Sequence, residues 1–163
     1  MKTISALEGG LAGAAALTLI HEAIKSLLPK APRMDLLGKE AIAKTWHKVD
    51  GRVPEKKLYT MALAGDLVSN ALYYSFAGIG KKQHALIRGA ALGLAAGVGA
   101  VVLPGKMGLS ERHSSRTLET RMMTIGLYVI GGIVAAGVMR FLERRKQQDH
   151  HVWEHRLVTS AMG

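Results

Sequence analysis

The stretch "MMTIGLYVIGGIVAAGVMRFL", residues 122–142, decides the fold class, because it carries no charged side chain before Arg140. A bilayer core is about 30 Å thick, and a helix needs about 20 apolar residues to cross it. This stretch has the required length and therefore predicts a transmembrane helix. Basic residues follow at once in "RFLERRK", as is typical of a segment that ends among anionic lipid headgroups.

Three further segments have a similar length and composition. Residues 85–103, "ALIRGAALGLAAGVGAVVL", are interrupted only by Arg88, and residues 58–79 contain Asp66 and Asn70. Residues 4–28 are the least clear, because their charge-free part, "GGLAGAAALTLI", is short. A cleaved signal peptide is the alternative there, but Glu8 intrudes and no convincing small-residue cleavage site follows. We expect a retained helix; a soluble bundle of very apolar helices stays open as an alternative.

These segments predict an all-α integral membrane protein with four antiparallel transmembrane helices, forming one domain over residues 1–163. Between the first two helices, residues 34–49 place apolar side chains on one helical face and mostly basic ones around the other sides. That pattern and Trp46 are typical of an amphipathic helix in the membrane interface, although a helix packed on protein is the alternative. Residues 143–163 are expected to continue the fourth helix as a basic tail.

The charge pattern favours lipid as the partner. The chain has 22 Lys and Arg against 12 Asp and Glu, a net charge of +10, and the basic residues crowd the flanks of the apolar segments. No basic face interleaved with aromatic residues appears, so nucleic acid is not expected as a partner. We expect a bacterial inner (cytoplasmic) membrane, and the basic residues slightly favour the first and third connections as cytoplasmic.

Small residues mark expected contacts between helices. Gly89, Gly93 and Gly97 recur every four residues, and Gly9 and Gly13 do likewise. Such stripes are typical of a glycine zipper, in which helix backbones approach closely. The contacts are expected within the four-helix unit or, alternatively, between copies of the chain.

Ionisable groups inside the apolar segments are the candidate site. In "LTLIHEAIKSLL", residues 17–28, His21 and Glu22 lie at a membrane depth similar to that of Asp66. Asn70 follows Asp66 by one helical turn, and Tyr73 and Tyr128 are expected nearby. The cluster is interpreted as a structural polar network, with a site for protons, ions or a small ligand as one alternative and a metal or haem site as another.

Two smaller groups complete the candidates. Glu8 and Arg88 are expected at the same depth near the other membrane face, where an ion pair would lower the cost of burying each charge, although Arg88 could instead reach the headgroups. In the tail, His151, Glu154 and His155 have workable metal-ligand spacing, with a solvated helical face as the alternative. No cofactor is predicted.

The sequence does not specify an activity. It has no cysteine, no phosphate-binding loop and no pattern of a catalytic triad, so an enzyme is not expected. Two functions from different classes remain. One is a structural or accessory subunit that packs with itself or with a larger membrane complex through its Gly-rich faces. The other is an oligomeric proton or ion channel, or a small transporter, that uses the His/Asp/Glu cluster.

Overall fold

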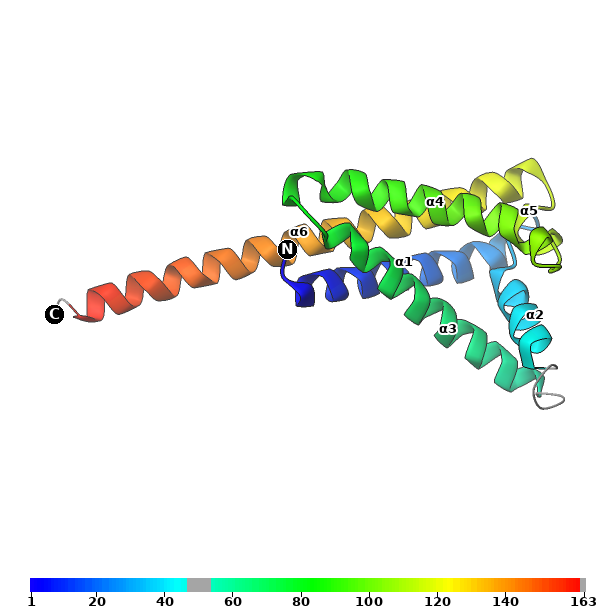
Figure 1. Cartoon of the computed structure of the whole chain (residues 1–163), viewed down its shortest axis with the longest axis horizontal. Coiled ribbons are helices and arrows are strands. Elements are labelled where there is room, and N and C mark those ends of the chain that lie inside the picture. Colours follow the sequence, from blue (N-terminus) through cyan, green and yellow to red (C-terminus); the bar gives the residue numbers. More distant parts are fainter. Residues whose placement is uncertain (47–53, 162–163) are drawn as a thin grey trace.

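A computed structural model describes residues 1–46 and 54–161, with side chains as far as residue 148. Over these residues the chain forms helices and no strand. The elements are α1 (Thr3–Leu27), α2 (Met34–Trp46), α3 (Glu55–Ser75), the 3-10 turns η1 (Phe76–Gly78) and η2 (Lys82–His84), α4 (Ala85–Lys106), α5 (Arg112–Ser115) and α6 (Leu118–Ala161). Successive long helices run in opposite directions, and α6 continues well beyond the others (Figure 1).

Three helical segments are long and apolar enough to cross a membrane: Thr3–Leu27, Lys82–Lys106 and Leu118–Gln148. Helix α3, which corresponds to the predicted span at residues 58–79, is not one of them within the described part of the chain. Its mean hydropathy is lowered by a charged first turn and by polar side chains along its length, among them Lys56, Lys57, Thr60, Asp66, Ser69 and Asn70. Over the described residues the chain is therefore all-helical with three such segments, one fewer than the sequence led us to expect.

Helix α6 packs against both α1 and α4, and these contacts are made at glycine residues, which have no side chain. On α4, a Cβ atom added at Gly93 would lie 2.6 Å from Val129 Cα, and one added at Gly97 would lie 2.7 Å from Ile125 Cα. On α1, one added at Gly13 would lie 2.6 Å from the Cβ of Ala135. These distances are too short for any side chain, so the backbones touch at these positions.

The other glycines of the two stripes also lie in close contact with α6. Gly89 lies against the backbone of Gly132, and Gly9 lies against Ala135 and Met139. The side chains of Ala135, Ala136 and Met139 beside them are fully buried. The described core is accordingly built mainly from small residues, which agrees with the low aromatic content of the sequence.

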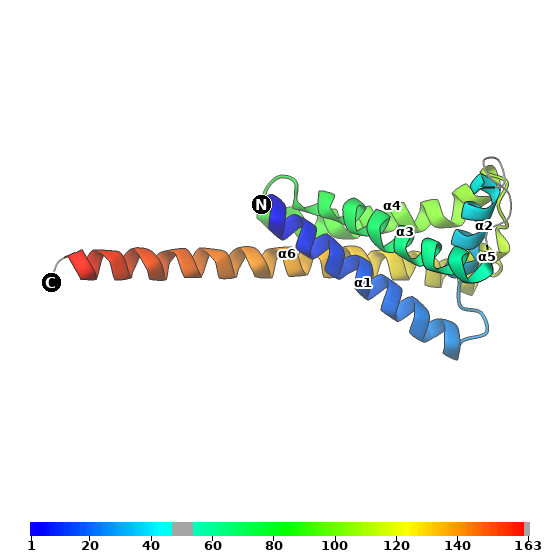
Figure 2. The ribbon, with the colours of Figure 1, turned by 90° about the horizontal axis from the view of Figure 1, so that it is seen from below.

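Helix α3 meets α1 at one end and diverges from it at the other. Gly10 of α1 lies against Ala71 and Ser75 near the end of α3. From there the two helices separate, and α2 crosses the wide end of the gap (Figures 1 and 2). At that end Gly38 of α2 approaches Ala62 of α3. The four long helices therefore do not form a uniformly packed bundle.

The first and third connections interlock at this wide end. The Arg33 N–H donates to the His113 carbonyl at 2.7 Å, and Glu40 accepts the Ser110 N–H at 3.1 Å with each carboxylate oxygen. The Thr120 hydroxyl donates to the Lys30 carbonyl at 2.8 Å. These bonds join segments far apart in sequence and fix α2 and α5 across the end of the helices.

Candidate functional site

A cavity in the described structure lies where α3 diverges from the other helices. Its volume is about 610 Å³, and α1, α2, α3, α4 and α6 all contribute to its wall. The predicted polar cluster lines it: His21 and Glu22 from α1, Asp66, Asn70 and Tyr73 from α3, and Tyr128 from α6. Small side chains of α4, including Ala96 and Ala100, form much of the opposite wall.

His21 is bound to the start of the first connection. Its side chain is nearly buried, with the residue 7% exposed, and its Nε2 lies 3.0 Å from the Pro32 carbonyl oxygen. The same atom lies 3.4 Å from the Met34 N–H. The protonated nitrogen would donate to Pro32, whereas the deprotonated nitrogen would accept from Met34. In either form His21 ties the end of α1 to the start of α2.

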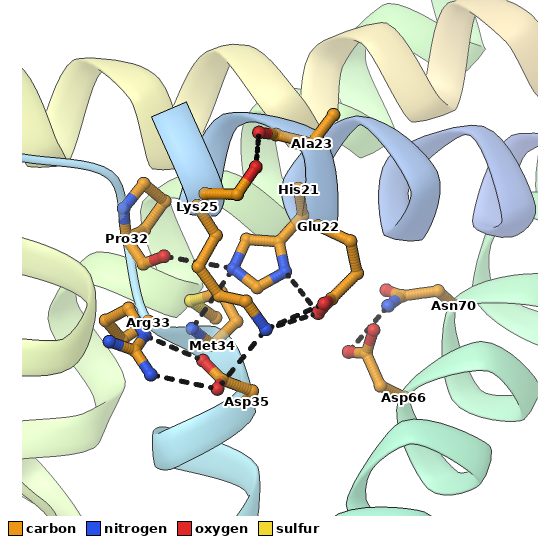
Figure 3. Close-up of polar contacts among 11 residues, drawn as sticks. His21, Glu22, Ala23, Lys25, Pro32, Arg33, Met34, Asp35, Asp66 and Asn70 are labelled. Atoms are coloured by element: carbon orange, nitrogen blue, oxygen red, sulfur yellow. Dashed lines mark hydrogen bonds and ion pairs between the residues drawn. The ribbon is translucent and has the colours of Figure 1, made fainter. Parts of the chain in front are cut away.

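A second polar group surrounds Lys25. Its ammonium donates to Glu22 at 2.7 Å and to Asp35 at 3.4 Å (Figure 3). Arg33 also pairs with Asp35, at 3.2 Å. The charges in "LTLIHEAIKSLL" are therefore satisfied by one another and by α2, which explains why a mostly apolar helix carries them near its end.

Asp66 and Asn70 form a separate pair. The Asn70 Nδ2 donates to the Asp66 carboxylate at 2.9 Å, across one turn of α3. Figure 3 shows this pair apart from the bonds that hold His21. The structure thus places His21 and Asp66 on the same cavity, as their matched depth predicted, but gives each its own hydrogen-bond partners.

Two tyrosines of α3 connect it to the neighbouring helices. The Tyr73 hydroxyl donates to the Leu92 carbonyl of α4 at 3.1 Å, and the Tyr74 hydroxyl donates to the Tyr128 carbonyl of α6 at 2.8 Å. Tyr74 is fully buried. The sequence pointed to Tyr73 and Tyr128 but not to Tyr74, although Tyr74 follows Asn70 by one turn and that spacing could have shown it.

The predicted Glu8–Arg88 ion pair is not formed. Glu8 pairs with Lys146 of α6 at 3.2 Å. Arg88 donates from its Nε to the Ala77 carbonyl and from its Nη2 to the Lys81 carbonyl, each at 3.0 Å. Carbonyl groups at a helix end lack partners within the helix, and the turn after α3 therefore offers Arg88 acceptors close to its own backbone.

Glu143 is another group that the sequence did not suggest. It is 5% exposed, accepts the Lys2 N–H at 2.7 Å and pairs with Lys82 at 3.3 Å. It thereby joins the N-terminal end of α1 and the η2 turn to α6. In the sequence Glu143 stands beside the basic tail, where a solvated charge is the ordinary expectation, and no local signal marks it.

The metal-site candidates receive no support from the described residues. The side chains of His151, Glu154 and His155 lie outside them. Among the residues whose side chains are described, no group of three His, Asp or Glu side chains is arranged to hold a metal ion.

No known protein family, no characterised protein and no solved structure matches this chain at a significant level.

The Asp35 network predicts how stability depends on pH. Burial raises the pKa of the Asp35 carboxyl, but hydrogen bonds and charge attraction from Arg33 and Lys25 outweigh it and hold that pKa below its ordinary value. Asp35 therefore stabilises the fold above its ordinary pKa of about 4, and this contribution is lost as the pH falls through the lower pKa of the folded state.

We expect the wild-type protein to lose more thermal stability than Asp35→Asn when detergent-solubilised samples are taken from pH 6 to pH 3. Circular dichroism melts at each pH measure this difference. Equal losses in the two proteins would show that the Asp35 carboxylate contributes no pH-dependent stability.

Proposed function

We propose that this chain is an integral membrane protein with an accessory role, which anchors itself in the bilayer and presents α6 to another subunit or to a second copy. The outward faces of α1, α4 and α6 support the first part of the proposal, that the chain is anchored in the bilayer. Leu19 is 71% exposed, Ile87 69% and Met122 65%. Apolar surfaces of this extent are unfavourable in water and ordinary in lipid.

The length of α6 supports the second part of the proposal, that α6 is presented to another subunit or to a second copy. It has 44 residues, which at about 1.5 Å per residue spans roughly twice the thickness of a bilayer core. Its far half extends alone, away from the other helices (Figures 1 and 2). Most helical stability in proteins comes from tertiary packing, so a helix that projects in this way is well suited to pack against a partner.

The finer topology belongs to the same proposal. Helix α3 is assigned as a fourth crossing, because Val68 and Leu72 expose apolar side chains while Asn70 and Tyr74 are buried. Helix α2 lies in the interface, with Leu37 buried and Lys44 exposed. The basic ends contact anionic headgroups of a bacterial inner membrane, with the first and third connections in the cytoplasm.

The glycine stripes are assigned to packing within one copy as a glycine zipper, because α6 already covers Gly89, Gly93 and Gly97. That assignment leaves the extension of α6 as the surface for assembly. An ion path through a single copy is not favoured, since Tyr74, Met139 and the buried alanines fill the space between α1, α4 and α6.

The proposal predicts that the full-length protein migrates as a complex larger than one copy when extracted from native membranes in mild detergent. A chain ending at Gln148, which keeps the Glu143 and Lys146 contacts, should migrate as a single copy. Size-exclusion chromatography with light scattering and mass spectrometry measures both masses and the composition of the complex.

Carbonate extraction is the control, and both chains should remain with the membranes. Release of the full-length chain into the soluble fraction would refute the membrane assignment. Equal masses for the two chains would refute the role given to α6.

A further inference from the structure

The cavity between α3 and α4 has the dimensions and composition of a small-molecule site. Its volume of about 610 Å³ lies within the usual range for ligand pockets, which are mostly apolar and carry a few polar groups that orient the ligand. Here much of the apolar wall comes from α4, including Ala96, Gly99 and Leu103, and the polar groups come from α1, α2, α3 and α6.

The charge of the cavity is opposite to that of the protein. The chain carries 22 Lys and Arg, yet the described wall contains neither; its ionisable acids are Glu22, Asp35 and Asp66. Lys25 and Arg33 together already neutralise Glu22 and Asp35. Asp66 has only the neutral Asn70 amide as its hydrogen-bond donor among the described residues and forms no salt bridge with them; the basic side chain that attracts its carboxylate across the cavity is His21, which bonds elsewhere.

A buried polar atom beside Asp66 also lacks a partner. Thr18 Oγ1 is shielded from solvent and has no hydrogen bond within the described structure. The Tyr128 residue, 8% exposed, lines the same part of the cavity. Thr18, Asp66 and Tyr128 line both the main cavity and a recess of about 20 Å³ beside it. Buried polar groups are normally paired, so the unpaired Thr18 hydroxyl beside the Asp66 carboxylate points to a bound group.

We propose that this cavity binds a lipophilic organic cation, with the positive charge at the Asp66 carboxylate and the apolar body against α4. A carboxylate in an apolar environment is costly without an opposite charge, and a cation with an apolar body supplies that charge while filling the space. Tyr73 and Tyr128 in the wall add aromatic faces, which attract cations. The site is independent of the α6 extension and of any partner bound there.

The test uses the full-length protein in nanodiscs, with tetraphenylphosphonium as the probe. Tetraphenylborate, which has nearly the same size and the opposite charge, is the matched ligand control. Equilibrium dialysis or calorimetry should show saturable binding of the cation and no saturable binding of the anion. Binding of both ions, or non-saturable uptake of the cation, would refute the site.

Asp66→Asn keeps the side-chain volume and removes the charge, and it should weaken cation binding at least tenfold. Glu8→Gln removes a carboxylate that pairs with Lys146 outside the cavity wall, and it should leave binding unchanged. Equal affinity in the wild type and in Asp66→Asn would overturn the proposal.

A second pair of variants decides the question if Asp66→Asn fails to fold. Gly99 lies in the cavity wall, and a Cβ added there would meet only Leu103 Cδ1, at 3.5 Å, so Gly99→Leu fills the cavity without a backbone clash. A Cβ added at Gly126 would meet no atom within 4 Å, and Gly126 is not part of the wall, so Gly126→Leu is the matched control. Gly99→Leu should abolish binding and Gly126→Leu should retain it. Binding retained in Gly99→Leu would place the cation elsewhere and refute the site.

Discussion

Gly93→Leu is expected to destabilise the protein by about 3 kcal/mol or more, because overpacking costs about 1–3 kcal/mol even where neighbouring side chains can move. At Gly93 the neighbours cannot move. The added Cβ would lie 2.6 Å from Val129 Cα and 2.9 Å from the Tyr128 carbonyl carbon, which are both backbone atoms of α6. Relief therefore requires the two helices to separate along their length, and that would also open the contacts at Gly89 and Gly97.

The effect is measured as the thermal unfolding midpoint of detergent-solubilised protein, together with its elution volume. Gly126→Leu is the matched control, since it makes the same change on α6 where no atom lies within 4 Å of the added Cβ. It should cost no more than about 0.5 kcal/mol. If Gly93→Leu melted with the control and eluted as the wild type does, the α4–α6 contact would not depend on close approach of the backbones.

The helix contacts are the part of the fold that could be predicted from the sequence. A period of four places Gly89, Gly93 and Gly97 on one helical face, and close approach needs a face without side chains. The sequence could not show that α6 covers this face, because α1 and α3 also offer small residues. It also could not show that α3 diverges from α1, since that divergence depends on how α2 and α5 fit across the open end.

For the polar groups, too, only part of the arrangement could be predicted from the sequence. The depth of His21, Asp66 and Asn70 follows from their distance to the helix ends, and the structure places them on one cavity. The partner of His21 does not follow, because a backbone carbonyl leaves no mark in the sequence. Pro32 accepts from His21 in this way, and Ala77 and Lys81 accept from Arg88. Where both partners were side chains within one helix, as for Glu22 and Lys25, the spacing of three residues could have predicted the pair.

His21→Leu is expected to lower stability by about 2 kcal/mol, because it removes the only side chain shown to bond the Pro32 carbonyl and leaves that group unpaired at a nearly buried position. The start of α2 would lose its link to α1. Thermal unfolding in detergent measures the change. His84→Leu is the control at an exposed histidine outside the cavity wall and should stay within about 0.5 kcal/mol of the wild type.

Combining His21→Leu with Asp66→Asn distinguishes two interpretations of the polar cluster. The structure gives His21 and Asp66 separate hydrogen-bond partners, so the two changes in stability, whatever the sign of the one at Asp66, should add to within about 0.5 kcal/mol. A direct ion pair between them would instead give a clear coupling energy, because the second substitution would remove a partner already lost. Additive changes would mean that His21 secures the connection to α2 while Asp66 remains available to the cavity. A large coupling would join them into one network and remove the basis for separate roles.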